Sequence, residues 1–150
     1  MPTPEAKIVN FISVTKNEFG YLRLLHANYK SEIGEAAPTD ADFASLLRAI
    51  EAGEILFYAC EDGGALVACC SVSPTFSTFD YRRGGVFEDF YVLPEYRHKG
   101  IARRLVEFAY AQSGVGSLTV GCADCDLELY RALGFRVPLG NMLAYDAPEQ

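Results

Sequence analysis

The chain has 150 residues and a mass of 16.5 kDa, about the size of one domain. Half of the residues are hydrophobic, and acids outnumber bases by 20 to 13, which gives a net charge of −7. This composition excludes a disordered chain and argues against general binding of nucleic acid or anionic membrane. No apolar stretch approaches the roughly 20 residues of a membrane span, and no signal-peptide pattern opens the sequence. We therefore expect one soluble, cytoplasmic domain spanning residues 1–150.

The first half of the chain predicts a strand, two helices and a β-hairpin. Thr15 and Glu18 have the spacing of a capping box, and apolar residues follow them at helical spacing. Thr39 or Asp40 can cap the second helix, which Gly53 ends. The expected strands span residues 7–14, 55–60 and 65–72, and the turn of the hairpin spans residues 61–64.

The second half predicts strands and helices in alternation. We expect a loop or strand extension at 73–81, a strand at 86–92, a helix from Gly100 to Gly114 and a strand at 117–120. A helix at 124–133, closed by Gly134, and a final strand pair at 135–137 and 142–145 complete the chain. The order β-α-α-β-β-β-α-β-α-β-β predicts a mixed sheet with helices, of the α+β or α/β class.

A strand, a proline-containing turn and a helix that begins at Gly100 form the most informative segment. Four of the thirteen basic residues lie between positions 97 and 104. Cations near a helix N-terminus oppose the helix dipole, and a bound anion such as a diphosphate would relieve that conflict. The alternative is an ordinary turn with a solvated basic face, and the local pattern alone does not decide between them.

Two motifs resemble signatures of the GCN5-related N-acetyltransferases. The segment Arg97-His-Lys-Gly100-Ile-Ala102 is similar to the family's R/Q-x-x-G-x-G/A loop. The segment from Leu129 and Tyr130 to Gly134-Phe135 is similar to the second signature, and both stand in the expected order. The resemblance implies a mostly antiparallel sheet with splayed fourth and fifth strands, helices on both faces, and acetyl-CoA bound in the gap.

The resemblance also implies roles for the loop and for the strand before it. Backbone N–H groups of the loop would hold the CoA diphosphate, and the end of the strand would pair with the pantetheine arm. An N–H of that strand would stabilise the developing oxyanion. The residues assigned to the cofactor are Phe90, Tyr91, Val92, Arg97, His98, Lys99, Gly100, Ile101, Ala102, Arg103 and Arg104.

Glu88 and Asp89 are adjacent acids in an otherwise apolar strand. Neighbouring side chains on a strand point to opposite faces, so only one would face the cleft unless a bulge intervenes. The segment 87–92 resembles the spermidine/spermine branch of the family, which implies Glu88 as general base, with Asp89 holding a cationic amine. The alternative is an ion pair of the strand acid with Arg82 or Arg83.

Tyr130 is implied as the general acid that protonates the CoA thiolate, and its alternative is a packing role on an amphipathic helix. The family often has Asn and Ala where this chain has Ala123 and Asp126, which argues against cofactor contacts from that helix but not against the fold. The residues expected around the acceptor amine are Tyr29, Glu32, Thr75, Tyr81 and Asp89.

The predicted function is acetyl-CoA-dependent N-acetylation of a primary amine on a small cationic molecule, such as a polyamine, an aminoglycoside or an amino acid. The alternatives are N-terminal acetylation of a protein or peptide and a non-catalytic acyl-CoA-binding regulatory module. Five cysteines, an odd number, favour reduced thiols, and Cys122 and Cys125 lack a second ligand pair, so no metal is expected. The sequence does not decide whether the chain forms a homodimer.

Overall fold

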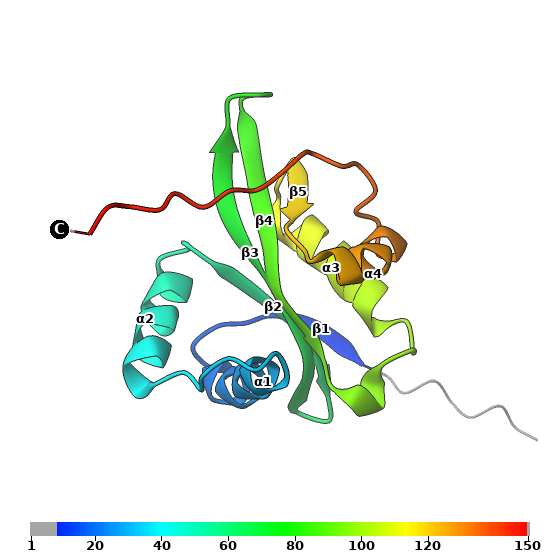
Figure 1. The fold of residues 1–150 in the computed structure, drawn as a ribbon. Coiled ribbons are helices and arrows are strands. Elements are labelled where there is room, and N and C mark those ends of the chain that lie inside the picture. The colour runs from blue at the N-terminus through cyan, green and yellow to red at the C-terminus, as the bar shows by residue number, and fades with distance from the viewer. Residues whose placement is uncertain (1–8, 150) are drawn as a thin grey trace, which may run out of the picture.

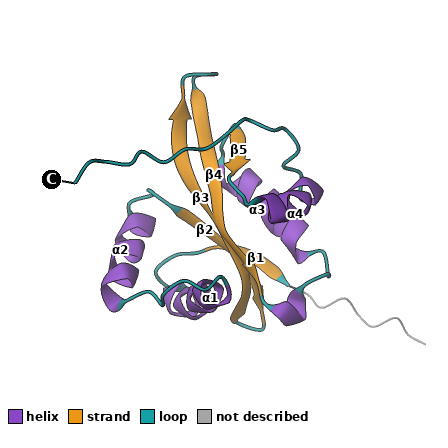
Figure 2. Ribbon diagram, in the orientation of Figure 1, coloured by secondary structure: helices purple, strands orange, loops and turns teal. Residues whose placement is uncertain are grey.

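The computed structural model describes residues 9–149 (Figures 1 and 2). Short 3₁₀ turns at Pro94–Tyr96 and Asp124–Asp126 precede the third and fourth helices. The helices and strands, in chain order, are β1 (Asn10–Ser13), α1 (Phe19–Glu32), α2 (Asp40–Glu51), β2 (Leu56–Asp62), β3 (Ala65–Ser77), β4 (Arg82–Val92), α3 (Ile101–Ser113), β5 (Ser117–Val120) and α4 (Leu127–Ala132). Within the described ranges, no helix combines the length and apolar character needed to cross a membrane.

The sheet has the order β1-β2-β3-β4-β5, and its first four strands are antiparallel. Only β4 and β5 run parallel, and their pairing stops where Phe87 faces Val120. The rest of β4, from Glu88 to Val92, therefore has no strand on its β5 side in the described structure. The predicted mixed, mostly antiparallel sheet with diverging fourth and fifth strands is confirmed.

Helices cover both faces of the sheet, with α1 and α2 on one face and α3 and α4 on the other (Figure 2). The buried residues of α1 are Phe19, Leu22, Leu25 and His26, at the three- and four-residue spacing of one helix face. In the same way, α3 buries Ile101, Leu105 and Ala109 against β2 and β3. The two apolar stripes account for the two cores of the fold.

Helix ends follow the predicted signals, with two exceptions: the cap of α1, and the start of α4, which lies at Leu127 rather than at Asp124 because residues 124–126 form a 3₁₀ turn. The Thr39 hydroxyl accepts from the Asp42 N–H and the Asp42 carboxylate accepts from the Thr39 N–H, a complete capping box for α2. Before α1, Glu18 accepts from the Thr15 N–H, but the Thr15 hydroxyl accepts from Asn17 and caps no helical N–H. The expected box at Thr15 is therefore only half formed.

Several strand boundaries differ from the sequence-based expectation. The expected loop or strand extension at 73–81 is confirmed, because β3 continues to Ser77 and a turn follows it, but β4 begins at Arg82 rather than at Val86. The first strand begins at Asn10 rather than at Lys7, which lies outside the described residues together with Ile8. The long β3–β4 hairpin rises beyond the other strands (Figure 1).

The expected final strand pair at 135–137 and 142–145 is wrong. Residues 135–149 form neither helix nor strand. Pro138 has no N–H to donate to a ladder, and Gly140 has a φ of 98°, which turns the chain away from an extended path. The segment instead crosses in front of the sheet and extends past it (Figure 1).

Gly85 marks the closest approach of β4 to its surroundings. A Cβ at this position would lie 2.5 Å from Val72 Cγ1 and 3.2 Å from Val115 Cγ1. Gly85 also faces Leu118 in the parallel pairing with β5. No side chain fits at this point, where β3, β4 and the start of β5 meet.

Candidate functional site

A β-bulge in β4 lies directly after the point where β5 stops pairing. Ser71 faces Glu88 and Cys69 faces Tyr91, so Asp89 and Phe90 together oppose the single residue Cys70. Asp89 has a φ of 54°, a conformation rare for a non-glycine residue. Because the bulge breaks the alternation of side chains, Glu88 and Asp89 both line one pocket.

This pocket has a volume of about 440 Å³ and is enclosed by segments that are distant in sequence. Helix α1 and the chain after it form one wall, and β4 with its bulge forms the floor. The residues after β5, helix α4 and the C-terminal segment form the opposite wall. The lining residues are Tyr29, Lys30, Glu35, Val86, Phe87, Glu88, Asp89, Phe90, Val120, Gly121, Cys122, Tyr130 and Met142.

The two carboxylates of the bulge differ in their surroundings. Asp89 is half-buried, and Ser71 Oγ donates a hydrogen bond of 2.7 Å to its Oδ2. Glu88 is exposed and makes no hydrogen bond or ion pair with any described residue. The alternative ion pair of a strand acid with Arg82 or Arg83 is not formed. Asp89 is thus a fixed carboxylate, whereas Glu88 is free to move.

Tyr130 reaches the same pocket from α4. Its ring packs against Phe90 and Phe135, with centroid distances of 6.3 and 5.9 Å. Burial raises the pKa of Tyr130 to about 12, so the phenol keeps its proton at neutral pH. Packing and proton donation are therefore compatible in this side chain.

The loop before α3 presents open backbone N–H groups. His98 and Gly100 both have positive φ, 61° and 80°, and no side chain caps the helix. The first N–H groups of α3 therefore have no side-chain acceptor, and the helix dipole adds positive potential there. This backbone arrangement fits an anionic group such as a diphosphate. Of the predicted cations, Arg103 donates to the Ala132 carbonyl at 2.7 Å and Arg104 lies over the Phe11 ring.

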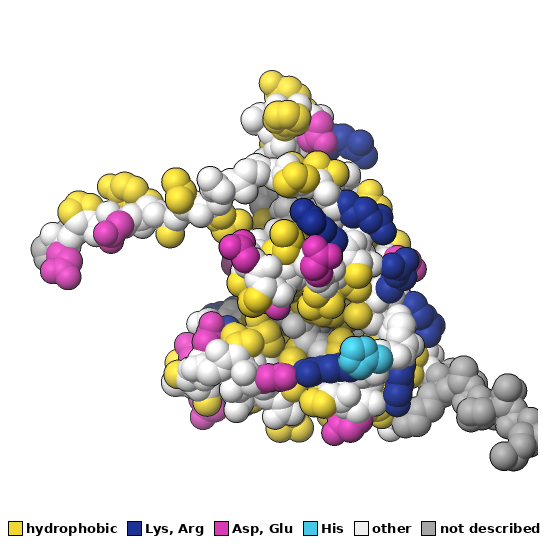
Figure 3. Space-filling view, turned by 45° about the vertical axis from the view of Figure 1, so that its right-hand side comes forward, with side chains coloured by type: hydrophobic (Ala, Val, Ile, Leu, Met, Phe, Trp, Pro, Cys, Tyr) yellow, Lys and Arg dark blue, Asp and Glu magenta, His cyan; other side chains and the backbone are white. Residues whose placement is uncertain are grey.

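Arg97 is held in place by the protein itself. Its Nε donates to the Val92 carbonyl at 2.9 Å, and its Nη2 donates to both carboxylate oxygens of Glu32 at 2.9 and 2.8 Å. This hydrogen bonding lowers the pKa of Glu32. Glu32, which we expected near the amine, does not line the pocket but joins α1 to the loop before α3. A row of acidic, basic and histidine side chains is visible along one lip of the hollowed face in Figure 3.

The structure brings together only part of the predicted acceptor site. Tyr29 and Asp89 line the pocket, but Thr75 and Tyr81 do not. Thr75 pairs with Gly84 near the end of the β3–β4 hairpin, and Tyr81 lies in its turn with a φ of 53°. Both positions are displaced because the hairpin is longer than the sequence suggested.

Sequence reasoning missed several residues of the pocket. Lys30 pairs with Glu35 at 2.8 Å, and Ser71 supports Asp89 from the neighbouring strand. Ser71 is the polar residue in a buried run, which is a usable signal because buried hydroxyls need partners. Met142 had no such signal, since its place depends on the path of the C-terminal segment.

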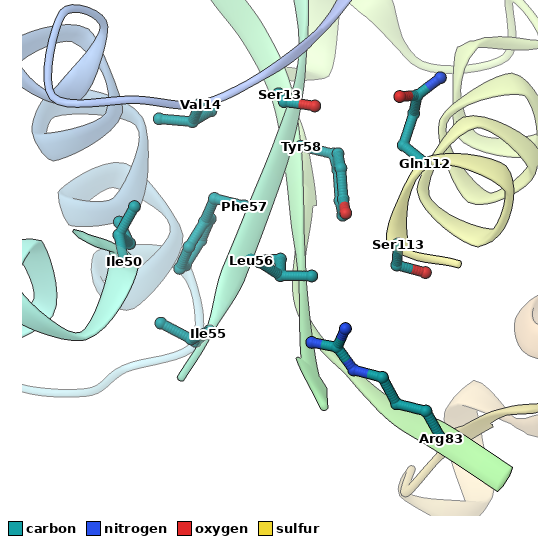
Figure 4. A pocket seen from close by; sticks show the side chains of 10 residues that line it. All are labelled: Ser13, Val14, Ile50, Ile55, Leu56, Phe57, Tyr58, Arg83, Gln112 and Ser113. Atoms are coloured by element: carbon teal, nitrogen blue, oxygen red, sulfur yellow. The ribbon is translucent and has the colours of Figure 1, made fainter. Parts of the chain in front are cut away.

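A second hollow of about 300 Å³ contains none of the predicted site residues (Figure 4). Val14, Ile50 and Phe57 form its apolar side, and Gln112 and Ser113 lie across from them. Arg83 is the charged residue of its lining, and no carboxylate or thiol joins it. Tyr58, a buried phenol, is the ionisable group of this lining besides Arg83. Because the hollow has no carboxylate and none of the predicted site residues, the pocket at the bulge is the candidate site.

The cysteines divide into two groups. Cys60, Cys69 and Cys70 are buried, and burial raises the pKa of each thiol. Cys122 and Cys125 are exposed and unbonded, and Cys122 lines the pocket. Among residues 9–149, no group of three or more potential ligands could hold a metal ion.

Iodoacetamide is expected to alkylate Cys122 and Cys125 at neutral pH and to spare the three buried thiols, because the thiolate is the reactive form. Peptide mass mapping after a short exposure checks this pattern. An adduct at Cys122 should block the pocket and inactivate the enzyme. Cys122→Ser should therefore keep its activity after treatment with iodoacetamide, whereas Cys125→Ser should lose it. Equal inactivation of both variants would contradict a pocket position for Cys122.

The chain belongs to the acetyltransferase (GNAT) domain family, whose model matches residues 53–137, more than half of its length. It is accordingly an N-acetyltransferase, as the loop and the Tyr130 signature predicted. The search of curated proteins returns no match to this chain.

Solved structures share the fold at low sequence identity. Glucosamine-6-phosphate N-acetyltransferase from Arabidopsis thaliana is 18% identical, with a TM-score of 0.72 over 92% of this chain and 98% of that one. An aminoglycoside acetyltransferase from an uncultured soil metagenomic sample, in complex with sisomicin, is 12% identical, with a TM-score of 0.79 over 94% and 97%. A predicted acetyltransferase from Clostridium acetobutylicum, solved with acetyl-CoA, is 13% identical, with a TM-score of 0.75 over 92% and 96%.

Proposed function

We propose that this protein transfers the acetyl group of acetyl-CoA to a primary amine of a small cationic molecule. The observation that carries the proposal is the β4 bulge, which turns Glu88 and Asp89 into the pocket that also holds Tyr130. Three carboxylates and one lysine lie in this lining, so its formal charge favours a cationic acceptor.

The diverging strands and the α3 N-terminus are the proposed binding site of the cosubstrate. Acetyl-CoA supplies an activated acetyl group bound to a thiolate leaving group. The free edge of β4 at Phe90, Tyr91 and Val92 offers backbone groups to its extended arm, and the N–H groups of residues 98–103 are directed at its diphosphate. We assign to a backbone N–H at the bulge the role of stabilising negative charge on the acetyl oxygen.

The protein's own side chains then handle the protons. Asp89, fixed by Ser71, holds the ammonium group of the acceptor by charge and hydrogen bonding. Glu88, exposed and mobile, accepts the proton that the amine must lose, directly or through water. Tyr130 donates a proton to the departing sulfur, which its raised pKa permits over the physiological range.

Thiol release from acetyl-CoA tests the proposal when polyamines, aminoglycosides and amino acids are supplied in parallel. We expect turnover with at least one cationic amine, with acetylated product found by mass spectrometry. Turnover only with peptides bearing a free N-terminus would favour the protein N-terminal alternative. Binding of CoA without turnover in any arm would favour a regulatory module and overturn the proposal.

The Glu32–Arg97 pair predicts a specific effect on cofactor binding. Glu32→Gln removes the charge that holds Arg97, so the loop before α3 loses part of its order. We expect the KM for acetyl-CoA to rise about fivefold, with a smaller change in kcat, because the pair is partly exposed. Steady-state kinetics measure both, with Glu35→Gln as a matched control on the acceptor side. A rise in the amine KM alone would contradict this assignment.

A further inference from the structure

The C-terminal segment and the β3–β4 hairpin both expose apolar side chains that nothing in the described chain covers. The hairpin end carries three aromatic residues on or beside its turn, and the segment after α4 carries five large apolar residues within nine positions. These side chains are between 68% and 99% exposed: Phe76, Phe79, Tyr81, Val137, Leu139, Met142, Leu143 and Tyr145. Both features project from the body of the molecule (Figures 1 and 3).

We propose that these two features form a reciprocal interface between two copies of this chain, in which the hairpin end of one copy contacts the C-terminal segment of the other. The four aromatic rings alone present roughly 500 Å² of surface. A stable interface needs about 800 Å² from each partner, and the exposed aliphatic side chains of Val137, Leu139 and Leu143 supply the rest. Apolar exposure on this scale is unusual for a monomer.

Charge favours the pairing of hairpin with C-terminal segment over the pairing of like with like. Arg82 and Arg83, directly after the turn of the hairpin, are exposed and form no ion pair with any described residue. Asp146 and Glu149 lie at the end of the C-terminal segment and are also exposed. With Asp80 on the hairpin turn and Arg136 at the start of the segment included, the hairpin end has a net charge of +1 and the segment a net charge of −1. Like-with-like contacts would bring equal net charges together, whereas the reciprocal contact brings opposite net charges together.

The backbone of the C-terminal segment is also unpartnered. Within residues 136–149, no backbone group takes part in a helix, a strand ladder or a turn hydrogen bond. The segment touches its own chain where Met142 approaches Gly121, at 3.1 Å from the position a Cβ would take there. Beyond Met142 it leaves the body, and seven extended residues reach about 23 Å. This reach lets residues 143–149 lie on a second molecule.

The interface joins the oligomeric state to the candidate site, because the same segment supplies Met142 to the pocket wall. A partner that holds Leu143 and Tyr145 fixes the position of Met142, so each copy orders the pocket wall of the other. The inference does not depend on which amine is acetylated.

Sedimentation velocity on the full chain tests the proposal without an activity measurement. We expect a species of twice the 16.5 kDa chain mass. Phe79→Asp and Leu143→Asp should each weaken association at least tenfold, and Leu24→Asp, which changes a residue 68% exposed on α1, should not. A wild-type monomer at every concentration, with the segment folded onto its own chain or reserved for another protein, would overturn the proposal.

A mixture of the two variants tests the reciprocal arrangement itself. In a mixed pair, the intact hairpin of Leu143→Asp meets the intact C-terminal segment of Phe79→Asp, which restores one of the two contacts. The mixture should therefore associate more strongly than either variant alone. If the mixture associates no better than either variant alone, hairpin and segment do not contact each other across the interface. Circular dichroism of each variant serves as the control that both are folded.

Discussion

Tyr130→Phe is expected to lower kcat by about 100-fold, the usual contribution of one positioned proton donor. The substitution removes the hydroxyl but keeps the ring that packs on Phe90 and Phe135, so the fold should not change. The KM for acetyl-CoA should stay within about twofold, because the hydroxyl acts on the departing sulfur and not on the ground state.

The control for this variant is Tyr110→Phe, which removes a half-exposed hydroxyl on α3, away from the pocket. The pH profile adds a second check. Because the pKa of Tyr130 is raised to about 12, its protonated form persists through the physiological range and no alkaline loss before about pH 11 should arise from this group. If Tyr130→Phe keeps the wild-type kcat, Tyr130 is not the proton donor to the thiolate.

Glu88→Gln is expected to lower kcat by a similar factor, about 100-fold at neutral pH, because the amide accepts no proton from the ammonium group. The loss of kcat should become smaller as pH rises, because a larger fraction of an alkyl amine with a pKa of about 10 is then already neutral. A pH series of kcat/KM for wild type and variant measures this convergence.

Asp89→Asn is the matched control for Glu88→Gln, because it changes the neighbouring carboxylate of the same bulge. We expect Asp89→Asn to raise the KM for the amine about tenfold with a smaller effect on kcat, as befits a binding carboxylate. The reverse pattern, with kcat lost at Asp89 and KM raised at Glu88, would exchange the two roles.

Features with short-range causes could be predicted from the sequence. Thr39 caps α2 through Asp42, three residues away, and Gly100 and Gly114 bound α3 with the left-handed conformations that glycine permits. The hairpin turn at 61–64 likewise contains two glycines of positive φ. Each signal acts within one turn of chain, so its physical cause is contained in the local sequence.

Features that depend on distant partners could not be predicted in this way. The bulge at Asp89 exists because of the register between β3 and β4, and this brings both acids into the pocket. The Glu32–Arg97 pair joins residues 65 positions apart. The C-terminal segment has apolar residues in a pattern that resembles strands, but it forms no strand on its own chain, because Pro138 lacks an N–H and Gly140 has a positive φ.

The absence of a side chain at Gly85 has a consequence for how the molecule can be altered. Gly85 pairs with Leu118 in the part of β4 that runs beside β5, before the two strands diverge, and the surrounding side chains leave no room there for a Cβ. Even a methyl group would have to push the side chain of Val72 or Val115 aside. A substitution at Gly85 would therefore disturb the packing of β3 and β4 against the start of β5, at a position outside the lining of the pocket.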